Sequence, residues 1–101
     1  MRDTERKIIV ESCDEAERIL SQDVGEDEFF YQFMAAQFLD IFKKAVTDTD
    51  YTVSNSALRN AIDQTFHLSS HEARLQGKFP IVWQGLMALQ PAAGQLNREF
   101  F

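Results

Sequence analysis

The sequence predicts an all-α protein, a small helical bundle of four to six helices with a central aromatic-rich helix. Apolar residues recur three and four positions apart along most of the chain, which is the spacing of one helix face. Only two Pro and four Gly interrupt it, and 45% of the 101 residues are hydrophobic, enough for a buried core. A chain of this length is expected to form one domain, residues 1–101.

The central helix is expected over Glu26–Val46, because residues 28–46 hold six of the twelve aromatic side chains. Its apolar arc is much wider than the stripe of a helix that is covered on one side only. We therefore expect neighbouring helices to cover it on more than one side. The remaining polar strip comprises Gln32, Gln37, Asp40, Lys43 and Lys44, and three acidic residues at the start favour the helix dipole.

The first helix is expected to start at a cap formed by Thr4 or Asp3 and to run to about Ser21. Its apolar stripe includes Cys13, which is therefore predicted to be a small core residue and not a nucleophile. A short strand through Lys7–Glu11 is the alternative, because three β-branched residues in a row are poor helix formers. An i,i+4 pair is expected between Asp14 and Arg18. The stripe comprises Ile8, Ile9, Cys13, Ala16, Ile19 and Leu20.

Three further helices are expected in the second half of the chain. Ser54 is suited to cap a helix over 54–68, with Val53 and Leu58 forming a hydrophobic staple. The spacing of Ser69 and Glu72 matches a capping box, so a short helix should follow and stop near Gly77. Pro80 favours the start of a last helix, which Gln90-Pro91 should end or kink.

The core is predicted from the apolar faces of these helices. Its members are Ile9, Leu20, Phe30, Phe33, Met34, Phe38, Ile41, Phe42, Leu58, Ile62, Phe66, Trp83 and Leu86.

The charge of the chain is concentrated near its N-terminus. Residues 1–28 hold ten acidic and four basic side chains, whereas residues 29–101 hold six of each, so the whole net charge of −6 lies in the first quarter. Solvated helix surfaces account for much of this asymmetry. The more specific interpretation is an acidic patch for another protein with a basic surface, formed by Glu11, Asp14, Glu15, Glu26 and Asp27.

No catalytic, cofactor or metal motif stands out, so we expect no enzyme, no cofactor and no metal. His67 and His71 are four apart beside Glu72, but the two serines between them predict a helix break. A metal-dependent hydrolase at these histidines is therefore the weakest hypothesis. Asp48 and Asp50 are interpreted as turn residues. The single cysteine fits a reducing compartment, and no apolar run has the length of a membrane span, so a cytoplasmic location is expected.

The favoured function is protein binding. The chain resembles, in general type only, short acidic helical proteins that dock onto a larger protein as inhibitors, antitoxin-like partners or chaperone-like adaptors. The alternative is a dimeric helix-turn-helix DNA-binding regulator that uses residues 54–78. The acidity of the chain argues against DNA, because phosphate binding requires the opposite sign of charge. The candidate DNA contacts are Arg59, His71, Arg74 and Lys78.

Self-association as a homodimer is also expected, through the central helix and the aromatic C-terminal segment. Two adjacent aromatic residues at a chain end are unusual unless they are docked. The competing explanation is that the last segment folds back onto the central helix within one chain. The residues assigned to self-association are Phe79, Trp83, Met87, Phe100 and Phe101.

Overall fold

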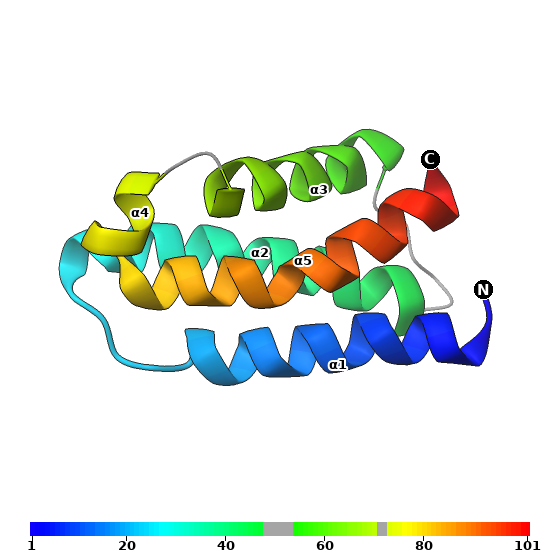
Figure 1. Cartoon of the computed structure of the whole chain (residues 1–101), viewed down its shortest axis with the longest axis horizontal. Coiled ribbons are helices and arrows are strands. Elements are labelled where there is room, and N and C mark those ends of the chain that lie inside the picture. The colour runs from blue at the N-terminus through cyan, green and yellow to red at the C-terminus, as the bar shows by residue number, and fades with distance from the viewer. Residues whose placement is uncertain (48–53, 71–72) are drawn as a thin grey trace.

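The computed structural model describes residues 1–47, 54–70 and 73–101 (Figure 1). These residues form five α-helices and no strand, which confirms the all-α prediction and excludes the strand considered at residues 7–11. The helices are α1 (Asp3–Leu20), α2 (Glu26–Thr47), α3 (Asn55–Ser70), α4 (Ala73–Lys78) and α5 (Pro80–Phe100).

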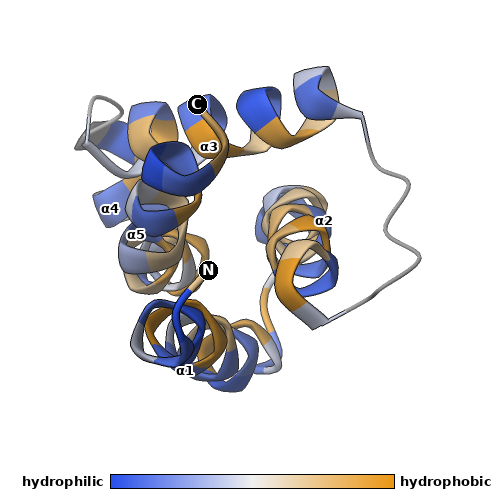
Figure 2. Ribbon diagram, turned by 90° about the vertical axis from the view of Figure 1, so that its right-hand side faces the viewer, coloured by the Kyte–Doolittle hydropathy of each residue, from blue (hydrophilic) through white to orange (hydrophobic). Residues whose placement is uncertain are grey.

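Helix α5 contacts each of the other four helices, and its contact with α1 is the most extensive in the molecule. The aromatic-rich helix α2 contacts α1, α3 and α5. Viewed along the bundle, α2 forms one side, with α1 below it and α3 above it (Figure 2). The described helices therefore cover the inner surface of α2 and leave its outer surface open.

Small side chains allow α1 and α5 to lie very close together. Cys13 and Ala16 of α1 are fully buried, as is Ala92 of α5. At Gly85 of α5 the approach is closest, since a Cβ atom there would lie 2.5 Å from the Cδ2 atom of Leu20. Real Cβ atoms do not come this near to another heavy atom, so this position requires glycine unless the neighbouring side chain shifts.

Helix α5 continues through Pro91 to Phe100, so of the two predicted effects of Gln90-Pro91, an end or a kink, the end is wrong. The backbone around Pro91 is completed by a side chain from α1. The Ser12 Oγ atom accepts a hydrogen bond from the Ala92 N–H (3.2 Å) and donates one to the Ala88 carbonyl (2.6 Å). In a regular helix that N–H would donate to that carbonyl directly. The Ser12 hydroxyl thus lies between two backbone groups of α5, next to the proline, that would otherwise bond to each other. Helix α5 bends in its second half (Figure 1).

Two side chains of α2 tie the ends of other helices together. Gln32, expected on the polar strip, is instead buried, and its Nε2 donates to the carbonyls of Leu20 (2.8 Å) and Gln22 (2.7 Å) at the end of α1. The Oε2 atom of Glu28 accepts from the N–H groups of Ile81 (3.0 Å) and Val82 (3.1 Å) in the first turn of α5. These bonds satisfy backbone groups that a helix end leaves without intrahelical partners.

The predicted helix starts are partly correct. Ser54 caps α3 by accepting from the Ala57 N–H (3.2 Å), whereas Val53 of the predicted staple lies outside the described residues. Glu72 of the predicted capping box also lies outside them, and Ser69 of that box lies within α3, so it does not start the next helix. The expected cap at Thr4 or Asp3 is wrong. Helix α1 already begins at Asp3, and the Arg2 N–H donates to the Glu5 carboxylate (3.0 Å). This hydrogen bond holds the pKa of Glu5 below its usual value.

The predicted core is confirmed at seven of thirteen positions, which are Ile9, Leu20, Phe38, Phe42, Leu58, Ile62 and Leu86. Met34, Ile41 and Trp83 are half-buried. The prediction is wrong for Phe30, Phe33 and Phe66, which are exposed by 70%, 58% and 36%. On α3 the inward positions near Phe66 belong to Thr65 and Ser69, whose hydroxyls donate to the carbonyl four residues earlier and can therefore be buried.

The close α1–α5 contact predicts opposite effects of the same substitution at two glycines of α5. Gly85→Ala should lower the free energy of unfolding by about 1–2 kcal/mol, because overpacking against Leu20 outweighs the better helix propensity of alanine. Gly94→Ala is the control: a Cβ atom there meets its nearest neighbours at 3.8 Å, so the variant should be about 0.5–1 kcal/mol more stable. Urea denaturation followed by circular dichroism measures both. Equal changes at the two positions would contradict the close approach.

Candidate functional site

Three phenylalanines on the N-terminal half of α2 project outward. Phe29, Phe30 and Phe33 are exposed by 60%, 70% and 58%. Positions 29 and 33 lie one turn apart and position 30 lies beside them, so the three rings share one side of the helix. Since a phenylalanine side chain can bury about 200 Å², together they leave roughly 380 Å² of aromatic surface open.

A shallow depression of about 410 Å³ adjoins these rings toward the C-terminal end of α2. Phe33 is one of the three exposed rings and also lines the depression. Asp40, at the C-terminal end of the depression, forms an ion pair with Lys44 (3.0 Å). We call the three phenylalanines and this depression together the outer face of α2. The depression is lined by Phe33, Ala36, Gln37, Asp40 and Ile41.

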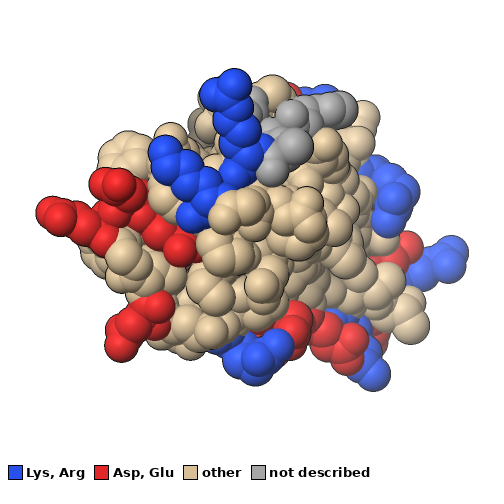
Figure 3. All heavy atoms as spheres, turned by 60° about the vertical axis from the view of Figure 1, so that its left-hand side comes forward, with Lys and Arg blue, Asp and Glu red and all other residues tan. Residues whose placement is uncertain are grey.

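Acidic residues flank the N-terminal end of the outer face. Asp23, Glu26 and Asp27 are all exposed, and within the described part of the chain none of them forms an ion pair. A group of acidic side chains stands at the left of the surface view, apart from the mixed charges along its lower edge (Figure 3). A polar, charged rim around an apolar centre is the usual composition of a protein interface.

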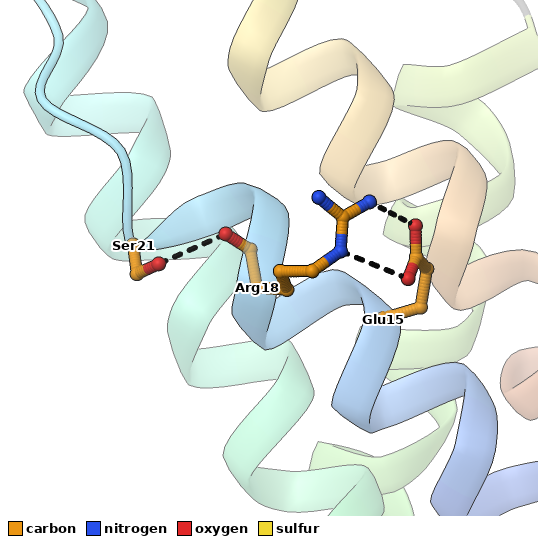
Figure 4. Close-up of polar contacts among 3 residues, drawn as sticks. All are labelled: Glu15, Arg18 and Ser21. Atoms are coloured by element: carbon orange, nitrogen blue, oxygen red, sulfur yellow. Dashed lines mark hydrogen bonds and ion pairs between the residues drawn. The ribbon is translucent and has the colours of Figure 1, made fainter.

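The α1 members of the predicted acidic patch are paired with basic side chains. Glu11 lies 3.7 Å from Lys7, and Asp14 lies 3.8 Å from Lys43 of α2. Arg18, expected to pair with Asp14, instead holds both carboxylate oxygens of Glu15 (Figure 4).

These contacts shift the pKa values of the paired groups and place basic side chains beside the carboxylates of α1. The hydrogen bond from Arg18 lowers the pKa of Glu15, and a 2.8 Å hydrogen bond to Glu17 raises the pKa of Lys43. The two other members of the predicted patch, Glu26 and Asp27, lie at the start of α2 beside the exposed rings. The acidic character is therefore least compensated next to the outer face of α2.

A second depression, of about 400 Å³, lies between α1 and α5. Ile8 at its edge is 43% exposed, although it was expected on the buried stripe. The Ser12 hydroxyl in its lining is already used by the α5 backbone. The depression is lined by Ile8, Glu11, Ser12, Glu15, Ala88 and Pro91. It offers less exposed aromatic surface than the outer face of α2.

The residues assigned to self-association are divided between the two ends of α5. Phe79 is buried and packs on Tyr31 with ring centroids 5.0 Å apart, so it contributes to the fold within one chain. Trp83 is half-buried, and its Nε1 donates to the Ser69 carbonyl (3.2 Å). Phe100 and Phe101 lie roughly 30 Å away at the other end of the helix. Met87, Phe100 and Phe101 are exposed by 38%, 43% and 52%.

The candidate DNA contacts do not form one basic surface in the described residues. Arg59 pairs with Asp63 (3.3 Å), donates to the Asn97 side chain (2.6 Å) and lies 5.2 Å from the Phe101 ring centroid. Arg74 and Lys78 are exposed on α4, whose six residues make fewer than two turns, which is short for a recognition helix. His71 lies outside the described residues.

The metal hypotheses find no support in the described residues. His71 and Glu72, like Asp48 and Asp50, lie outside them. Among the residues that are described, no group of three or more His, Cys, Asp and Glu side chains could hold a metal ion.

Cys13 is placed as a core residue. Its side chain is fully buried, and this burial raises the pKa of the thiol from 9.0 to about 12. Thiolate is the nucleophilic form of cysteine, and a thiol with a raised pKa forms little thiolate at neutral pH. The Cys13 side chain is therefore expected to be unreactive.

Comparison of the chain with known proteins finds no matching family model, no similar curated protein and no similar solved structure. Among the described residues, no helix is both long enough and apolar enough to span a membrane.

The raised pKa of Cys13 predicts slow thiol chemistry and a specific pH dependence. At pH 8 the native protein should react with a thiol-specific reagent about 100-fold more slowly than the protein in denaturant. Because the folded pKa lies above the unfolded one, the thiol stabilises the fold below pH 9.0, and this contribution is lost as the pH rises toward about 12.

The matched variant for this prediction is Cys13→Ala. Its free energy of unfolding should fall less steeply above pH 9.0 than that of the wild type, as measured by denaturation at several pH values. Rapid modification of native Cys13 at pH 8 would show that the thiol is accessible and would contradict its position in the core.

Proposed function

We propose that this protein is a non-enzymatic protein-binding module that docks through the outer face of α2. The observation that carries the proposal is the exposure of Phe29, Phe30 and Phe33 on one side of a helix whose opposite side is packed in the core. Aromatic side chains that can be desolvated together supply most of the binding energy at protein interfaces.

The energetics of this surface support binding. Each of these three phenylalanines keeps more than half of its area in water, and burying that area would contribute about 25 cal/mol per Å². An aromatic area of roughly 380 Å² falls within the size range of the largest apolar patches on monomeric proteins, and such patches often have a function. Glu26 and Asp27 at its edge add the charge that steers a partner into position. DNA binding is less well supported, because Arg59 is engaged within the chain and α4 is short.

The test is site-specific photo-crosslinking in an extract of the native host. A benzophenone amino acid at position 30 should form a covalent protein adduct, because the ring at that position contacts the partner directly. Position 100 is the matched control, since it is also an exposed phenylalanine near the end of another helix. An excess of the same protein without the benzophenone should reduce the amount of adduct formed at position 30. Nuclease treatment should not remove the adduct, because its second component is a protein.

Two results would contradict the proposal. One is the absence of any competed protein adduct at position 30. The other is the same set of adducts at positions 30 and 100, which would show that exposed apolar positions of this protein crosslink non-specifically.

A further inference from the structure

Resting on the proposed function, we infer that the occupant of the outer face of α2 is a second copy of the same chain, with the two α2 helices packed antiparallel about a twofold axis. The helix carries both halves of a complementary contact on one side. Its first turns present the protruding rings of Phe29 and Phe30, and the 410 Å³ depression follows along the helix from Phe33 to Ile41. In a twofold interface the same patch must fit itself.

The antiparallel register follows from where the two features lie along the helix. Placing the rings of one copy over the depression of the other sets residue 29 opposite residue 41 and residue 33 opposite residue 37. The twofold axis then lies level with position 35, between Phe33 and Gln37, and the adjacent Ala36 is exposed and has the smallest side chain of the outer face. A small residue at the crossing point lets two helices approach to about 8 Å.

The charges along the helix agree with the same register. With the axis level with position 35, Glu26 of one copy lies opposite Lys44 of the other, and the pair occurs twice by symmetry. Lys44 is about half exposed and contacts Asp40 within its own chain, so Glu26 of the other copy would join an existing ion pair at each end of the interface. A parallel arrangement would instead place Glu26 beside Glu26, where like charges repel.

The area of the surface sets the expected strength of the dimer. The three rings contribute about 380 Å² from each copy, and the residues of the depression bring the total buried area to the order of 1,200 Å², the lower end of specific interfaces. We therefore expect a dissociation constant in the micromolar range, and an equilibrium between monomer and dimer that shifts with concentration.

Light scattering after size exclusion tests whether this dimer forms. Across the micromolar range the mass should rise from 11.6 kDa toward twice that value. Phe30→Gln should weaken association at least about tenfold, because each substitution removes a ring from the interface twice. Phe100→Gln, also at an exposed phenylalanine, should leave it unchanged. Circular dichroism of both variants checks that the helices are retained.

Crosslinking of introduced cysteines with a short thiol-specific reagent tests the register of the two α2 helices. The native Cys13 should not react, because it is buried. A reagent that spans about 8 Å should link two copies of the Ala36→Cys variant. It should also link Glu26→Cys to Lys44→Cys in a mixture. Two copies of Lys44→Cys should not be linked, because those positions lie about 27 Å apart along antiparallel helices.

Three results would overturn the inference: a monomer throughout the micromolar range, a dimer that survives Phe30→Gln, or efficient linkage between two copies of Lys44→Cys. A monomer that still forms a competed adduct with a different protein at position 30 would refute the second copy as occupant and leave the proposed function standing. A monomer without any such adduct would refute both.

Discussion

The close packing of α1 against α5 is the constraint on which the rest of the structure depends. Two features make it specific. Gly85 admits the side chain of Leu20, and the hydroxyl of Ser12 bridges the α5 backbone between Ala88 and Ala92, beside Pro91. A proline inside a helix normally leaves backbone groups without partners, and here the neighbouring helix supplies one. This arrangement lets α5 run unbroken to Phe100 and contact every other helix.

Helix α2 is attached to this pair by its inner side and by two polar ties. Gln32 holds the end of α1, and the carboxylate of Glu28 holds the start of α5. Phe38 and Phe42 supply the buried apolar contact from α2. Because these groups already hold the helix, we expect the exposed rings at Phe29, Phe30 and Phe33 to contribute little to its placement, although Phe30 also contacts the Tyr31 ring (ring centroids 5.5 Å). In the proposed docking function, the partner binds this exposed aromatic surface.

Helical periodicity predicted the helices and much of the core, because the stripes at Ile9, Leu58 and Ile62 are narrow enough to define one buried side. On α2 the apolar arc is so wide that periodicity cannot show which part has neighbours, and Phe30 and Phe33 were therefore assigned to the core. The roles of Ser12, Gln32 and Glu28 were not predicted, since each depends on a contact with a distant part of the chain. The exposed rings became a candidate site only when the packing of α2 was known.

The fold should not depend on the exposed rings of α2. Equilibrium denaturation of the triple variant Phe29→Gln/Phe30→Gln/Phe33→Gln, at concentrations below those at which the protein associates, tests it most directly. We expect a loss of less than about 1.5 kcal/mol in the free energy of unfolding, because substitutions of exposed residues have small effects. A loss of more than about 3 kcal/mol, the cost of truncating a buried phenylalanine, would instead show that these rings belong to the core.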